Sequence, residues 1–167
     1  MGQIIGFAIF FKVIYFAFLI FLTMLTCRMF KIEKINKDEW ILIGVLSLID
    51  LISGVTNIYV KQYSLFYLLM LVIILGIIFG FIKSKRSLLN FLSVYSLFLV
   101  IVSIWGWTFA LDTVNIFKVY ILSILLSPIT PTGSLDLWIS LIIAILIHIF
   151  SLLGMLVWPK IREKVHK

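Results

Sequence analysis

The sequence predicts an all-α protein, a polytopic helix bundle that crosses a lipid bilayer about five times. Apolar residues make up 63% of the 167 residues and charged residues only 13%, whereas a soluble domain is roughly 45–50% apolar and about 25% charged. The apolar residues also form runs close to the ~20 residues that a helix needs to cross about 30 Å of hydrocarbon. These runs are apolar at odd and even positions alike, which argues against the alternating strands of a membrane β-barrel.

We expect a single integral membrane domain over residues 1–167, with spans that follow one another closely. They are expected at about 4–27, 40–59, 65–82, 88–110 and 135–158. The first is interpreted as a retained helix, because no basic residue precedes it as in a secretory signal. Cys27 is expected to be a buried or interfacial structural thiol.

The segment 112–132 differs from the five runs. It is mostly apolar, but it begins at Asp112, Lys118 interrupts it, and Pro128 and Pro131 break it. Because it is short for a full crossing, we predict an outer re-entrant or interfacial helical element. A sixth crossing is the alternative.

Charge placement predicts the orientation, because cytoplasmic loops hold the excess of Lys and Arg. With five crossings and an outer N-terminus, almost all basic side chains fall on the cytoplasmic side. They are Arg28, Lys31, Lys34, Lys37, Lys83, Lys85, Arg86, Lys160, Arg162, Lys164 and Lys167. We therefore expect a plasma-membrane protein with a cytoplasmic C-terminus. Its net charge of +7 is expected to serve contact with lipid rather than nucleic acid.

Three ionisable residues, Lys12, Asp50 and His148, fall near the middle of apolar spans. A charge at the bilayer centre costs about 2.5–3.5 kcal/mol, so such residues usually face the protein interior and pair. Lys12 and Asp50 lie at similar depths in spans joined by a short loop, and we predict that they form an ion pair. Snorkelling of Lys12 to the headgroups and an ion-coupling role for Asp50 and His148 are the alternatives.

Small and polar residues share helix faces with these groups. Small side chains let membrane helices approach closely, and polar ones hydrogen-bond between helices. Asn57 falls on the face of Asp50, and Ser140, Ala144 and Ser151 fall on the face of His148. Gly76 and Gly80 form a small-xxx-small pattern that predicts close packing, either within the chain or against a partner.

The sequence contains no catalytic triad, paired cysteines, zinc motif or phosphate-binding loop. We therefore expect no catalytic residue, cofactor or metal. The favoured interpretation is a non-enzymatic component, a small subunit or accessory protein of a bacterial membrane transport or envelope-assembly complex. It would work with a membrane-protein partner or a second copy. The alternatives are a small ion- or proton-coupled transporter using Asp50 and His148, and a membrane protein of the bacteriocin or toxin immunity type.

Overall fold

The computed structural model describes residues 2–56, 63–109 and 137–157. Over these residues the chain is all-helical, which confirms the predicted class. The helices are α1 (Gly2–Met29), α2 (Lys37–Thr56), α3 (Tyr63–Ile82), α4 (Arg86–Phe109) and α6 (Leu137–Leu156). The predicted element at 112–132, with Asp112, Lys118, Pro128 and Pro131, lies outside the described residues, and so does Asn57.

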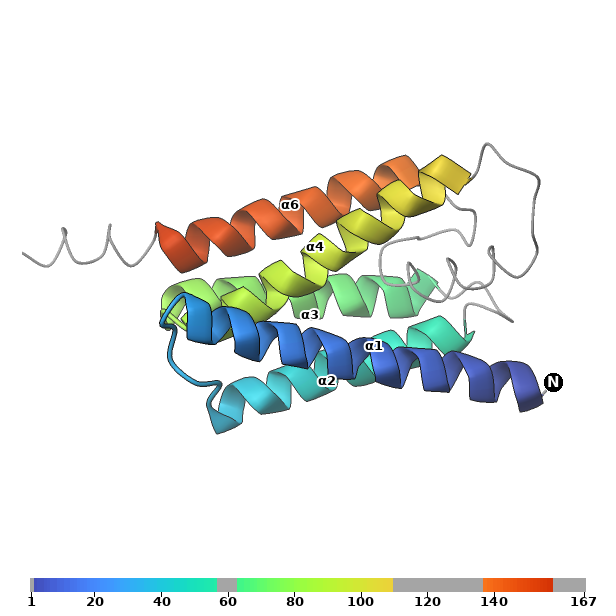
Figure 1. The fold of residues 1–167 in the computed structure, drawn as a ribbon, viewed down its shortest axis with the longest axis horizontal. Helices are drawn as coiled ribbons and strands as arrows, with labels where there is room; N and C mark the ends of the chain where they lie inside the picture. Colours follow the sequence, from blue (N-terminus) through green and yellow to red (C-terminus); the bar gives the residue numbers. More distant parts are fainter. Residues whose placement is uncertain (1, 57–62, 110–136, 158–167) are drawn as a thin grey trace, which may run out of the picture.

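The helices lie side by side and alternate in direction (Figure 1). Helix α4 is central: it contacts α1, α2, α3 and α6, and its contact with α6 is the most extensive. The end of α1, the start of α2, the end of α3, the start of α4 and the end of α6 all meet at one end of the bundle (Figure 1). That end carries Arg28, Lys31, Lys34, Lys37, Lys83, Lys85 and Arg86, and we call it the basic end.

Two helices end at the basic end in the same backbone motif. Lys31 and Ser84 adopt positive φ values of 51° and 54°. After α1, Ile32 N–H donates to the Cys27 carbonyl at 2.8 Å. After α3, Lys85 N–H donates to the Gly80 carbonyl at 2.9 Å. These are Schellman endings, which satisfy free carbonyls at a helix terminus.

Helix α2 begins three residues before the apolar run that predicted it. Asn36 N–H donates to Glu39 Oε2 at 3.1 Å, the return half of a capping box. Asp38 and Glu39 lie in the first turn, where negative charge stabilises the helix dipole. The polar residues before Trp40 therefore belong to the helix.

Glycines bring α3, α4 and α6 close together. A Cβ added at Gly80 would lie 2.6 Å from Leu89 Cγ, and one at Gly154 would lie 2.6 Å from Phe81 Cε2. A Cβ at Gly76 would lie 3.3 Å from Leu42 of α2. The Gly76–Gly80 pattern therefore packs within the chain.

The bundle exposes large apolar side chains on its outside and buries several polar ones among its apolar core. Large apolar side chains are exposed on every helix, for example Phe10, Ile41, Leu71, Ile101 and Phe150. The interior has an apolar core, and it also holds charged and polar side chains, namely Lys12, Thr23, Glu39, Asp50, Ser53, Ser87, Asn90, Ser93, Ser96, Ser103 and Ser151. Monomeric soluble proteins rarely expose apolar patches larger than a few hundred Å².

Two stretches of helix, Ile9–Met29 and Arg86–Trp105, are long and apolar enough to cross a membrane. The shorter apolar stretches are Tyr67–Ile82 and Leu141–Leu156. These two stretches, found in the described part of the chain by length and composition alone, are weak evidence for insertion into a membrane.

Candidate functional site

The candidate site is a buried ion pair between α1 and α2. Lys12 Nζ lies 2.7 Å from Asp50 Oδ1, and both side chains are 0% exposed. This is the pairing expected from the sequence. The snorkelling alternative requires an exposed ammonium group, which Lys12 does not have. Breaking a buried pair by removing one partner commonly costs about 3–5 kcal/mol.

Helical periodicity directs both side chains inward. Lys12, Tyr15 and Leu19 recur at three- and four-residue spacing and are all buried, so they form one face of α1. Leu46, Asp50 and Ser53 do the same on α2. Because residues three and four apart share a helix face, each charge lies on the buried, inward-facing side of its helix.

Aromatic rings surround the pair on the side of α4. Lys12 Nζ lies 5.5 Å from the centroid of the Tyr15 ring, within the range of a cation–π contact. The Tyr15 and Tyr95 ring centroids are 6.3 Å apart. Tyr95 also stacks on Phe91 with an interplanar angle of 16° and on Phe16 with one of 13°.

This site has more hydrogen-bonding capacity than its protein contacts use. Asp50 Oδ2, Tyr15 Oη and Tyr95 Oη are buried and have no hydrogen-bond partner among the described residues. Most buried polar atoms in proteins are paired. One acceptor and two hydroxyl groups therefore remain available beside the ion pair to a proton or a small polar species.

His148 belongs to a different contact, between α6 and α4. Its Nδ1 lies 2.9 Å from the Ser93 carbonyl oxygen and 3.2 Å from Ser93 Oγ. It also lies 3.4 Å from Ser96 Oγ. A carbonyl only accepts, so the geometry favours the tautomer with the proton on Nδ1. The structure thus gives His148 and Asp50 different hydrogen-bond partners on different helix pairs.

The remaining packing residues lie on α6. Ala144 and Ser151 are buried, in agreement with an inward face. Ser151 Oγ has no hydrogen-bond partner among the described residues. Ser140 is part of α6, and its side chain lies outside the described part.

A polar cluster at the basic end was not predicted. Ser87 Oγ donates to Glu39 Oε2, and Lys85 Nζ lies 3.7 Å from Glu39 Oε1. Glu39 is only 1% exposed, and its burial is not apparent from the sequence. The Asn36-x-x-Glu39 spacing was the available signal, because it is typical of a capping box.

Asn90 was also missed, and it links α4 to α1. Its Nδ2 donates to Thr26 Oγ1 at 2.7 Å, the Thr23 carbonyl at 3.2 Å and Cys27 Sγ at 3.2 Å. Cys27 is buried, as expected of a structural thiol. Asn90 lies close to the basic Lys83–Arg86 segment, so the sequence made it resemble a residue near a helix end.

No family model matches the chain, and no curated protein or solved structure is significantly similar to it. Among the described residues, no three His, Cys, Asp or Glu side chains are placed to hold a metal ion. The features of the chain that bear on its function are the ion pair, the exposed apolar faces and the basic end.

Proposed function

We propose that the chain is a multi-pass plasma-membrane protein, with five crossings, an outer N-terminus and a cytoplasmic C-terminus. The large apolar side chains exposed on every described helix support this proposal above all other observations. Lipid covers exposed apolar helix faces without cost, whereas buried polar groups find partners within a helix bundle. The basic end supports the orientation, because Lys and Arg accumulate on the cytoplasmic side.

Within the membrane, the protein works as a non-enzymatic component of a transport or envelope-assembly complex. The Lys12–Asp50 pair supports this role because an ion pair between α1 and α2 favours a single register of the two helices. Buried polar groups can specify a unique packing, as single polar residues do in coiled coils. A defined bundle of this kind presents a constant surface to a membrane-protein partner.

The test is purification of the full chain, carrying a terminal tag, from its own membranes in a mild detergent. We expect a second membrane protein to copurify in fixed stoichiometry. That partner should be lost from the Asp50→Leu variant and regained with Lys12→Met/Asp50→Leu, because the double variant restores an uncharged but packed contact. A chain that purifies alone and monomeric would contradict the role as a subunit.

A second candidate is a proton-coupled transporter based on Asp50. The observation that favours it is that Asp50 Oδ2 and the Tyr15 and Tyr95 hydroxyl groups are buried without a hydrogen-bond partner in the described part of the chain. Ionisable groups in membrane interiors often form proton relays. In liposomes containing a pH-sensitive dye, this candidate requires a proton flux that Asp50→Asn abolishes. Flux no greater than in empty liposomes would eliminate it.

A further inference from the structure

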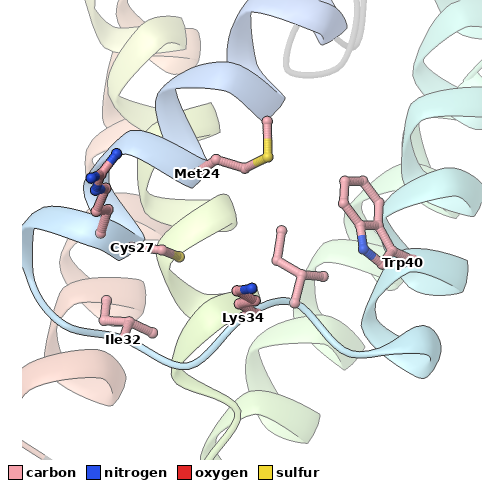
Figure 2. Close-up of a pocket in the computed structure, with 7 residues that line it drawn as sticks. Met24, Cys27, Ile32, Lys34 and Trp40 are labelled. Carbon is pink, nitrogen blue, oxygen red and sulfur yellow. The ribbon is translucent and has the colours of Figure 1, made fainter.

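A pocket of about 620 Å³ opens at the basic end, between the end of α1, the loop 30–36 and the start of α2. Figure 2 shows Met24, Cys27, Ile32, Lys34 and Trp40 around it. Its volume falls within the roughly 300–1,000 Å³ typical of small-molecule sites. The Lys12–Asp50 site lies further along the same two helices, so this pocket is separate from it.

The lining of the pocket is divided between two kinds of side chain. Arg28 and Lys34 supply positive charge, and Met24, Ile35 and Trp40 supply an apolar wall. Neither Glu33 nor Asp38 lines the pocket, and the buried Glu39 nearby is held by Asn36 N–H, Ser87 Oγ and Lys85 Nζ. The lining therefore matches a ligand that is anionic at one end and apolar at the other.

Local hydrogen bonds hold the pocket in shape. On one side, the Schellman ending of α1 fixes Ile32 against Cys27. On the other side, the contact between Asn36 N–H and Glu39 fixes the start of α2. A site with fixed walls loses less entropy when a ligand binds.

We propose that this pocket binds one anionic phospholipid of the cytoplasmic leaflet. Its phosphate would pair with Arg28 and Lys34, and the upper part of an acyl chain would cover Met24 and Trp40. Basic pockets on the cytoplasmic side suit anionic headgroups, and Trp side chains favour the membrane interface. Met24 is 51% exposed and Trp40 is 40% exposed, so a soluble anion alone would leave this apolar wall uncovered. The inference rests on the membrane orientation proposed above.

The test uses the fluorescence of Trp40. The other four tryptophans are replaced by Phe, and the full chain is reconstituted in phosphatidylcholine nanodiscs. A minor fraction of brominated phosphatidylglycerol or brominated phosphatidylcholine is added as quencher. We expect stronger quenching by the anionic lipid, because the site concentrates it beside Trp40. In Arg28→Gln/Lys34→Gln this preference should fall by about fivefold for each basic side chain removed.

The matched control is Lys37→Gln/Lys83→Gln, which removes the same charge from the basic end but from residues that do not line the pocket. It should keep the preference. If both double variants lose the preference for anionic lipid equally, the pocket is not the binding site and the basic end attracts anionic lipid only diffusely. Loss of the preference in millimolar inorganic phosphate would also overturn the proposal. Equal quenching by both lipids in the parent would refute the site while supporting insertion. No quenching by either lipid would refute the membrane proposal itself.

Discussion

At the residue scale, the buried ion pair between Lys12 and Asp50 should contribute most to the stability of the bundle. We expect Lys12→Met and Asp50→Leu each to lower the free energy of unfolding by about 3–5 kcal/mol, because each leaves an uncompensated buried charge. The double variant should recover most of this loss. Unfolding in mixed micelles with increasing dodecyl sulfate would measure all three. Additive losses would show that the two residues are not coupled.

The control for this cycle is Lys34→Met. It removes a lysine that is exposed and lies in the loop 30–36, outside the bundle interior. Surface substitutions usually change stability by no more than about 0.5 kcal/mol. A large change in the free energy of unfolding of Lys34→Met would mean that the losses in the other variants come from removing any charge and not from breaking the ion pair.

Asn90 gives a second prediction at this scale. Asn90→Leu removes the contacts to Thr23, Thr26 and Cys27 and should destabilise by about 1–2 kcal/mol, the range for polar contacts between membrane helices. Leu97→Ala is the control, because Leu97 is exposed on the same helix. The same micelle titration compares the two variants. Equal losses in the free energy of unfolding would show that the hydrogen bonds of Asn90 do not contribute to stability.

Single residues differed in how well the sequence predicted them. Lys12 and Asp50 stood out because charge in an apolar run demands a partner, and their similar depth identified it. Glu39 and Asn90 lie among other polar residues near helix ends, so no contrast distinguished them. Their burial depends on tertiary packing: α4 covers Glu39 through Ser87, and α1 supplies the acceptors of Asn90.

At the scale of elements, glycines set how closely the helices approach. Gly80→Ala would place a methyl group 2.6 Å from Leu89 Cγ, and overpacking of this kind costs about 1–3 kcal/mol. Gly44→Ala is the matched control, because within the described part of the chain its added Cβ has no packing neighbour within 4 Å apart from its own helix backbone. It should be neutral or stabilise by about 0.5–1 kcal/mol through helix propensity. Thermal unfolding in detergent, followed by circular dichroism, separates the two.

The end of α1 offers a prediction in the opposite direction. Lys31 adopts a left-handed conformation with φ 51°, which costs a side chain about 1–2 kcal/mol and a glycine almost nothing. Lys31→Gly should therefore raise the midpoint of thermal unfolding. Lys31→Ala removes the same charge but keeps Cβ, so it should not. A rise in both variants would attribute the gain to charge.

The sequence located these elements well and their ends less well. Hydropathy marked the centre of each helix, because an apolar run of about twenty residues is typical of a membrane-spanning helix and of few other structures. It placed the start of α2 at Trp40, since hydropathy does not detect the hydrogen bond from Asn36 to Glu39. The residues with positive φ at the ends of α1 and α3 are Lys31 and Ser84. Glycine usually occupies this position and marks a helix end in the sequence, and neither helix has it there.

At the scale of the whole molecule, the proposed orientation can be tested by labelling. Cys27 is replaced by Ser, and single cysteines are introduced at Lys34, Ser84, Gln3 and Leu137. An impermeant maleimide should label intact cells at Gln3 and Leu137 only, because the basic end faces the cytoplasm. All four should react after the membrane is opened. Labelling of Lys34 or Ser84 in sealed cells would reverse or refute the orientation.

The buried pair also has a consequence for how the protein is made. Lys12 and Asp50 are 38 residues apart, so α1 leaves the ribosome before its partner helix does. Entering the bilayer alone, either helix would carry an unpaired charge at a cost of about 2.5–3.5 kcal/mol. Entering together, they bring a neutral pair. The insertion machinery should therefore retain α1 until α2 arrives and release both to lipid as a single hairpin.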